Sequence, residues 1–389
     1  MIWKETCVMD QRMRFVVARA EGAENMSELC RHFGISRKTG YKWWRRYYAD
    51  GVAGLSDRSR APEHHPRAVD EALIGPIVAL RHRYPTWGPR KIKAWLEDHE
   101  PAVKWPAAST IGSVLDAHGL TRHRKRRRKT PPYGRPFATA QQPNDVWCAD
   151  FKGWFLTGDG TQVDPFTLSD AHSRFLLRLE AVGRTDTAHV WPILETAFRD
   201  YGLPRALRTD NGPPFAGRGV AGLSRLAVTL IKAGVVPERI EPGQPQQNGR
   251  HERMHLTLKQ DTASPPAQSL AEQIVRFRSF RKIYNHERPH EALDQVPPAR
   301  IYQPSPRLFD GRLRSPDYDD TVEVRKVRRN GEIKWRGSSI YLSSALVGEP
   351  VGLYRIGEEA WLAKYGPLVL GTVKGKIGLI RPNEKPIAQ

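Results

Sequence analysis

Three acidic residues of this 389-residue chain stand where a carboxylate could do chemistry. Asp150 interrupts the apolar run VWCADF (146–151), which we expect to form a buried strand, and a carboxylate there is costly unless a partner or a metal ion compensates its charge. Asp210 ends a second short strand where the chain turns, although Asp-Asn-Gly is also ordinary turn chemistry. Glu252 lies in the first turn of a predicted helix. Three acids without a Cys or His ligand pattern would suit Mg²⁺ or Mn²⁺, which prefer oxygen ligands.

The helix that carries Glu252 has further polar residues at helical spacing. Glu252, His255 and Lys259 are spaced i, i+3 and i+7, so we expect them on one face. An acid, an imidazole and an ammonium together could hold a cation and meet an anion. A solvated helix face can carry the same three residues without any such role.

The stretches around the three acids resemble the retroviral-integrase-type core of DDE transposases from bacterial insertion sequences. The matching motifs are WCADF, TDNG, PQQNGRHERMHLTLK and, further on, YNHERPHEAL (284–293), and the resemblance covers roughly residues 142–302. The gap of 42 positions between Asp210 and Glu252 is several longer than the family usually shows. A longer helix or loop within 218–234 would account for the difference.

The resemblance implies a ribonuclease-H-like core with Asp150, Asp210 and Glu252 as catalytic residues that hold two Mg²⁺ or Mn²⁺ ions. Water would cleave DNA at the end of a mobile element and free a 3′-OH, which would then attack target DNA without a covalent protein intermediate. The implied partners are the element ends, the target DNA and a second copy of the chain, since the active complex would be a homodimer or a higher oligomer. In this region DNA contacts are expected from Gln247, Asn248, Arg250, His255 and Lys259.

The charge of the chain favours a nucleic-acid partner. It has 62 Lys and Arg against 42 Asp and Glu, a formal net charge of +20. A basic membrane-surface protein is the alternative, but no long apolar run, strong amphipathic anchor or signal peptide is visible in the sequence. The three cysteines are scattered and follow neither a disulfide nor a zinc pattern. We therefore expect a cytoplasmic, nucleoid-associated bacterial protein and no membrane partner.

Two helical modules are predicted before the core, at residues 1–55 and 66–120. The first has three short helices with a Gly-containing turn before a basic, aromatic helix, which is the helix-turn-helix pattern, and we expect Trp43 in its core. The alternative is a three-helix bundle with a solvated basic face. The second module is read as another helix-turn-helix. The residues expected to contact phosphate or bases are Arg37, Lys38, Lys42, Arg45 and Arg46 of the first module and Arg58 and Arg60 of the following linker.

A basic linker is predicted at residues 121–141. Its run RHRKRRRK has seven basic residues in eight positions, and such a run stays extended until it meets phosphate. A solvated linker is the alternative. The expected DNA-contacting residues in this run are Arg124, Lys125, Arg126, Arg127 and Arg128.

The core, residues 142–303, is predicted to be α/β with a mixed five-stranded sheet. The expected strands are 146–155, 162–168, 174–182, 205–209 and 238–240, with helices near 187–201 and 222–233 and over the Glu252 segment. In a ribonuclease-H-like fold the first and fourth strands are neighbours, so Asp150 and Asp210 would converge. The competing acids Asp164, Asp170, Asp186 and Asp200 are assigned to turns and helix ends.

The last part of the chain, residues 315–385, has short β-type runs separated by charged or Gly-rich turns. These runs predict a small β-barrel, which could contact DNA or be purely structural. As a whole, the sequence predicts a multidomain DNA transposase. Two alternatives remain open: a non-catalytic helix-turn-helix DNA-binding regulator with an integrase-like core, and a ribonuclease-H-type nuclease without strand transfer.

Overall fold

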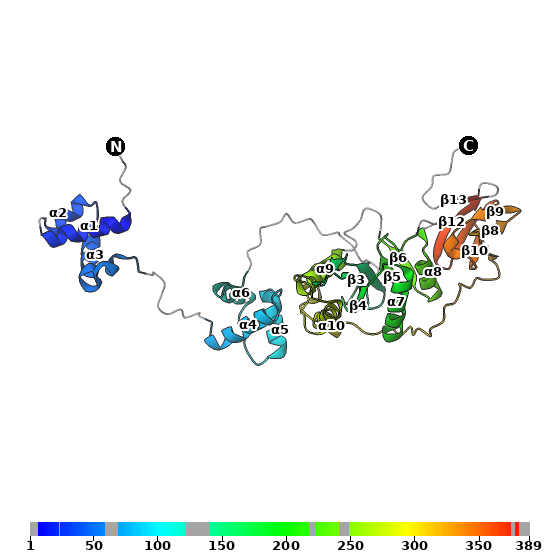
Figure 1. The fold of residues 1–389 in the computed structure, drawn as a ribbon, viewed down its shortest axis with the longest axis horizontal. Coiled ribbons are helices and arrows are strands. Elements are labelled where there is room, and N and C mark those ends of the chain that lie inside the picture. Colours follow the sequence, from blue (N-terminus) through cyan, green and yellow to red (C-terminus); the bar gives the residue numbers. More distant parts are fainter. Residues whose placement is uncertain are drawn as a thin grey trace, which may run out of the picture. The chain divides into compact units, whose positions relative to one another are not determined.

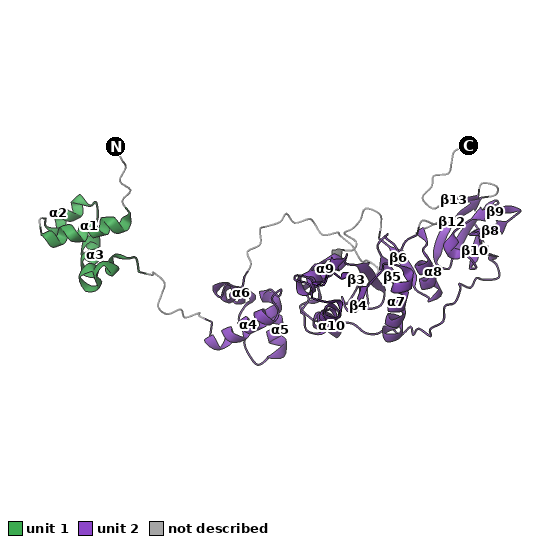
Figure 2. Ribbon diagram, in the orientation of Figure 1, with its two compact units in different colours: residues 1–68 green, residues 69–389 purple. Residues whose placement is uncertain are grey.

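The computed structural model describes residues 7–22, 24–58, 69–121, 140–217, 222–240, 249–374 and 378–380, and at residue 250 the backbone alone. The chain divides into two compact units, residues 1–68 and residues 69–389 (Figure 2). None of the helices within the described ranges is long and apolar enough to span a bilayer.

The first unit is a three-helix module with its own core. Helices α1 (Val8–Glu21), α2 (Met26–His32) and α3 (Arg37–Asp50) are followed by a 3₁₀ turn, η1 (Gly51–Leu55). A capping box at Asn25 begins α2, and the Ser36 hydroxyl accepts from the backbone of Thr39 to begin α3. Phe15, Leu29 and Trp43 are buried together, which confirms that Trp43 is a core residue.

The second unit opens with another three-helix module. It contains α4 (Glu71–Arg83), α5 (Pro89–His99) and α6 (Ala108–Ala117). Asp70 caps α4, and Pro89 occupies the first position of α5, where its missing N–H costs nothing. The buried side chains of this module include Ile77, Trp87 and Ile111.

A mixed sheet forms the centre of the second unit. Its strands are β1 (Val146–Phe151), β2 (Phe155–Leu156), β3 (Gln162–Asp170), β4 (Leu176–Val182), β5 (Ala206–Thr209) and β6 (Val236–Arg239). The order is β4-β3-β1-β5-β6, antiparallel from β4 to β1 and parallel from β1 to β6, with the short β2 paired to β3. This is the strand order of a ribonuclease-H-like core.

The sheet has six strands rather than the predicted five. The predicted strand 146–155 is two strands, because Gly153 has a left-handed φ of 84° that ends β1 and redirects the chain. Residues 155–156 then pair with 162–163 as a short hairpin.

Helices cover both faces of the sheet (Figure 1). Helices α7 (Thr187–Tyr201) and α8 (Arg225–Lys232) pack on one face, where the core includes Trp147, Phe166, Leu194 and Leu226. Helices α9 (Gly249–Thr262) and α10 (Leu270–His286) pack on the other, where Val163, Met254 and Phe277 are buried together. The 3₁₀ turns η4 (Glu291–Leu293) and η5 (Pro298–Arg300) follow α10.

The C-terminal region is a β-domain that packs on α8. Strands β7 (Glu323–Lys326), β10 (Pro350–Arg355), β11 (Ala360–Tyr365), β12 (Leu368–Lys374) and β13 (Gly378–Ile380) form an antiparallel sheet in the order β13-β12-β11-β10-β7, and β8 (Glu332–Trp335) pairs with β9 (Ser338–Tyr341). One core joins Trp335 and Trp361 to Ile231 of α8. In the described part of the chain β13 and β7 are the open edges of the sheet, so barrel closure stays a prediction.

Candidate active site

Parallel pairing of β1 and β5 places two of the predicted acids side by side. Cys148 lies opposite Arg208 in this register. The spacing of 60 positions between these two residues also separates Asp150 from Asp210. Because neighbouring strands are about 4.8 Å apart, continuing the register past β5 brings the backbones of the two aspartates close together.

The side chain of Asp150 leaves β1 on the face of the sheet that α9 covers. Successive residues of a strand point to opposite faces. Trp147 and Ala149 belong to the core under α7, so Cys148 and Asp150 point the other way. Asp150 is half-buried, and its backbone carbonyl accepts a hydrogen bond from the Thr167 hydroxyl at 3.0 Å.

Asp210 follows the last residue of β5 and also takes part in the turn. Its Oδ1 accepts from the backbone N–H of Gly212 at 3.2 Å, and the Asn211 amide donates to the Ile240 carbonyl at 3.0 Å. The turn chemistry expected of Asp-Asn-Gly is therefore present. It also fixes the carboxylate at the carboxyl end of β5.

Helix α9 presents Glu252 to solvent and two imidazoles to the sheet. Glu252 and Lys259 are exposed, whereas His251 and His255 are buried, with 3% and 6% of their surface accessible. The Nε2 atoms of His251 and His255 lie 2.6 and 2.8 Å from Oγ1 of Thr167 on β3. Thr167 is paired opposite Asp150, so this contact holds α9 over the strand that carries the first acid.

The prediction that His255 shares an exposed face with Glu252 and Lys259 is wrong. His255 lies at the border of the buried face of α9, next to Met254 and three residues before Leu258, and both of these are buried. Thr167 provides its ring with a polar partner in the interior. Its imidazole is therefore not on the surface where DNA would be met.

The hydrogen-bond pattern defines the tautomers of both histidines. The single hydroxyl proton of Thr167 goes to the Asp150 carbonyl, which can only accept, so both imidazoles donate their Nε2–H to the Thr167 oxygen. The free Nδ1 of His251 then accepts from the Ser169 hydroxyl at 3.3 Å. Burial lowers the pKa of His251 to about 3, and burial with the neighbouring His251 and Lys152 lowers the pKa of His255 to about 2. Both rings are neutral at pH 7.

Asp150, His251 and His255 form the one group of three possible metal ligands within 4.8 Å of one another in the part of the chain that the structure describes. Two imidazoles and a carboxylate suit transition metals better than Mg²⁺. Each Nε2 atom already hydrogen-bonds to Thr167, and through this contact the two imidazoles position α9. His251 was missed in the sequence, where its spacing of four positions from His255 was the available signal.

One of the four competing acids is not where the sequence placed it. Asp170 ends β3 and its carboxylate accepts from Ser173 of the following turn, Asp186 caps α7, and Asp200 lies near the end of α7 in an ion pair. Asp164 instead lies within β3, opposite Val182, so it belongs to the strand predicted at 162–168 and not to a turn or a helix end. One of its carboxylate oxygens is buried without a partner, and burial raises its pKa.

The predicted DNA-contacting residues of α3 are mostly exposed. Arg37, Lys38, Lys42 and Arg45 are exposed and Arg46 is half-buried, with the charged groups of Lys42 and Arg46 4.6 and 5.2 Å from the centre of the Trp43 ring. Arg58 is exposed and pairs with Asp50 at 2.5 Å. The remaining predictions lie outside the described residues, and they are Arg60, Arg124, Lys125, Arg126, Arg127, Arg128, Gln247, Asn248 and the side chain of Arg250.

Comparisons with known proteins agree with this architecture. Two models of the integrase core domain match residues 140–245 and 233–298, a helix-turn-helix domain matches 11–63, and a homeodomain-like domain matches 39–115. The chain is 26% identical over 253 residues to an uncharacterized protein of insertion element IS476 from Xanthomonas euvesicatoria, covering 64% of this chain and 70% of the relative. It is 27% identical over 252 residues to an uncharacterized protein of insertion element IS407 from Burkholderia multivorans, covering 64% and 87%. Together these matches support an insertion-sequence transposase with an integrase-type core. The transposase thus combines this core with helix-turn-helix domains, which bind DNA.

Two solved structures with some similarity to the transposase come from viruses. A chain of the simian T-cell lymphotropic virus intasome in complex with a PP2A regulatory subunit is 15% identical, covers 79% of the transposase and 100% of that chain, and has a TM-score of 0.37. The HTLV-2 integrase catalytic core in complex with magnesium is 13% identical, covers 42% and 99%, and has a TM-score of 0.31. Similarity at this level adds nothing to the family assignment.

Proposed function

We propose that this transposase binds the ends of its mobile element, cleaves a phosphodiester bond to expose a 3′-OH and joins that 3′-OH to target DNA. The observation that supports the proposal is the parallel register of β1 and β5, which, continued by two residues, brings the backbones of Asp150 and Asp210 close together. We assign the role of the third acid to Glu252, which lies in the first turn of α9. The helix that carries it is held to the sheet next to Asp150 through His251, His255 and Thr167.

The donor set fits Mg²⁺ or Mn²⁺. Asp150 and Asp210 are half-buried and Glu252 is exposed, so their carboxylates offer oxygen ligands at the solvent boundary. A pair of such ions supplies charge neutralisation on the phosphorus and activation of the attacking and leaving oxygens. Asp150, Asp210 and Glu252 would hold these ions.

Other residues of the chain position these carboxylates. Thr167, His251 and His255 hold α9 against β3 through neutral hydrogen bonds, so they add no positive charge that would compete with cations. Lys259 is exposed seven positions after Glu252, about 10 Å further along the helix, where it can contact a phosphate of the donor DNA end.

The two proposed steps conserve bonds and protons. In the first, the oxygen of water bonds to phosphorus, the bond to the 3′ oxygen breaks, and that oxygen takes up a proton. In the second, the 3′ oxygen bonds to a phosphorus of the target, and the target's own 3′ oxygen leaves with the proton. No bond to the protein forms in either step.

DNA recognition is assigned to the flanking domains. The exposed residues Arg37, Lys38, Lys42 and Arg45 on α3 would contact the element end. On the C-terminal domain, Lys326 and its exposed neighbours Arg328 and Arg329 would form a further phosphate contact. Because two ends must be joined, we propose a homodimer or higher oligomer as the active complex, working on DNA in the bacterial cytoplasm.

A strand-transfer assay tests the proposal. The transposase is incubated with Mg²⁺ or Mn²⁺, a labelled oligonucleotide that carries the end of the parent element, and a target plasmid. We expect joined product with the wild type and with Asp164→Asn, a control acid in the same domain, and only background with Asp150→Asn. Tight DNA binding without cleavage or joining in either metal would instead support a non-catalytic DNA-binding regulator, a function that the retention of all three acids disfavours.

A further inference from the structure

The motif YNHERPHEAL (284–293) has no part in the proposed chemistry, yet it makes most of the contacts between the second helical module and the core. The Tyr84 hydroxyl, at the end of α4, donates to the Glu287 carboxylate. On α5, Lys91 donates to the Pro289 carbonyl, and Arg90 pairs with Glu291 at 2.8 Å. The motif therefore lies against α4 and α5.

Two further contacts extend this interface on either side of the motif. Asp98, near the end of α5, pairs with Arg300 of η5 at 2.6 Å. Ile283, on the last turns of α10, packs against the apolar core of the helical module. The interface thus combines apolar packing with charged pairs, as expected of a specific contact between domains.

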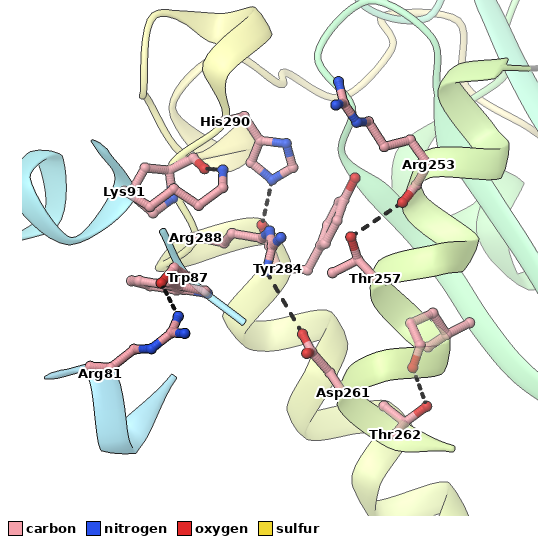
Figure 3. A network of polar contacts seen from close by, with 12 residues as sticks. Arg81, Trp87, Lys91, Arg253, Thr257, Asp261, Thr262, Tyr284, Arg288 and His290 are labelled. Atoms are coloured by element: carbon pink, nitrogen blue, oxygen red, sulfur yellow. Dashed lines mark hydrogen bonds and ion pairs between the residues drawn. The ribbon is translucent and has the colours of Figure 1, made fainter. Parts of the chain in front are cut away.

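The same interface reaches the helix that carries Glu252. Asp261, in the last turn of α9, forms an ion pair with Arg288 of the motif at 3.7 Å. The side chain of Thr86, in the turn between α4 and α5, also lies beside the Asp261 carboxylate and lowers its pKa, against the larger effect of burial. Figure 3 shows Arg288 between Asp261 and the motif residues Tyr284 and His290, with Lys91 on the neighbouring helix. Arg288 is 11% exposed, and a cation so buried needs its partner.

Part of the basic charge of the second module is used in contacts with the core. Arg90 and Lys91, the basic residues at the start of α5, both contact the core. Helix α6 has the sequence ASTIGSVLDA, with no Lys or Arg, whereas α3 of the first module begins with two basic residues and contains more. The two helical modules therefore differ in charge. The basic helix α3 of the first module is fitted to bind phosphate, whereas the second module uses basic residues to contact the core.

We propose that residues 69–121 act as a brace for the catalytic core, docked on the motif 284–293, and that Thr86 and Arg288 fix α9 through Asp261 and so set the position of Glu252. Arg288 and Thr86 are positioning residues, since they act through α9. The consequence for Glu252 rests on the proposed function. The docking of residues 69–121 on the motif does not depend on the proposed function.

Charge reversal across the interface tests the docking. Glu291→Arg with Arg300→Glu places like charges opposite Arg90 and Asp98 and leaves the net charge of the protein unchanged. Adding Arg90→Glu and Asp98→Arg to this double variant gives a fourfold variant, in which both ion pairs are restored with their charges exchanged. A protease site inserted after residue 130 in the full chain allows the module and the core to be separated covalently. After cleavage, we expect co-elution for the wild type and the fourfold variant and separate elution for the double variant. Co-elution of the double variant to the same extent as the wild type overturns the docking.

Hydrogen exchange and catalysis then test the bracing. In the uncleaved double variant we expect amide exchange over residues 252–262 to become about tenfold faster. Strand transfer should fall by a similar factor while binding of the DNA end is unchanged, and the fourfold variant should recover both. Separation of the pieces with unchanged exchange on α9, or with faster strand transfer, refutes the brace, the latter in favour of an autoinhibitory contact. If the wild type performs no strand transfer, the proposed function fails, while elution and exchange still decide the docking and the bracing.

Discussion

Replacing Thr167 by valine should loosen the whole active-site face of the core. The hydroxyl donates to the Asp150 carbonyl and accepts from His251 and His255, so one oxygen serves three polar groups. Valine has nearly the same shape and removes the hydrogen bonds of the hydroxyl to all three groups. A buried polar group left unpaired costs about 1–3 kcal/mol, so we expect a loss of about 3 kcal/mol or more.

Native-state hydrogen exchange measures this loss where it occurs. Because the chain has several domains, a single global unfolding midpoint would mix their stabilities. The free energy of opening should be followed at the amides of β1 and α9, the two elements that Thr167 connects. The strand-transfer rate should fall in parallel, since Asp150 and Glu252 lie on these elements.

Thr257→Val is the matched control. Thr257 also lies on α9, but its hydroxyl donates to the Arg253 carbonyl at 3.2 Å on an exposed part of the helix. Its loss should cost less than about 0.5 kcal/mol, as is usual for a surface substitution. If Thr167→Val costs less than about 1 kcal/mol, or no more than this control, then Thr167 does not hold α9 on the sheet.

Three further predictions concern other parts of the chain. Burial, with nearby cations, lowers the pKa of His290 to about 3, so the folded state keeps this ring neutral. Because the unfolded chain takes up a proton at this ring below its ordinary pKa, the free energy of unfolding is highest above pH 6.5. It should fall by about 1 kcal/mol at pH 5.5. His290→Gln should lack this part of the loss when unfolding is compared at pH 7 and 5.5, and an unchanged difference would contradict the assignment. Gly40→Ala should lower the melting temperature of the first unit, because the new Cβ would lie 2.4 Å from a buried cysteine sulfur. Gly75→Ala has nothing within 4 Å of the new Cβ and should stabilise α4 by about 1 kcal/mol. Thermal unfolding shifts of the same sign and size for the two variants would contradict this prediction. Lys38→Ala with Lys42→Ala should reduce the slope of log affinity for DNA against log salt by about 2, and an unaltered slope would remove α3 from the phosphate contact.

The sequence was informative wherever a signal was local. The apolar run around Asp150 predicted β1, and the helix predicted at 187–201 matches α7 in both bounds. The strand break at Gly153 was not predicted, because a glycine within an apolar stretch fits a strand as well as a bend. The alternation of faces along β1 requires only the strand itself, which is why the acid could be recognised before its neighbours were known.

Contacts between distant positions could not be predicted from the sequence in the same way. Thr167 and His251 are 84 positions apart, and nothing local marks a threonine in a strand as the partner of two imidazoles. His255 was therefore assigned to a surface, where a polar ring is most often found. The interface of the second module depends on residues as much as 204 positions apart, as between Arg83 and Glu287. Closure of the C-terminal strands is likewise a long-range property.

The distance along the chain between the acids has a consequence for the order of events during synthesis. The first unit has its own core and is complete once residue 58 has been made. Asp150 and Asp210 meet only after β5 has paired with β1, and α9 with Glu252 is added still later. Domains fold as units from the N-terminus while the ribosome is still extending the chain. Under the proposed function, a nascent transposase would therefore be able to hold DNA near its own site of synthesis well before it could cut it.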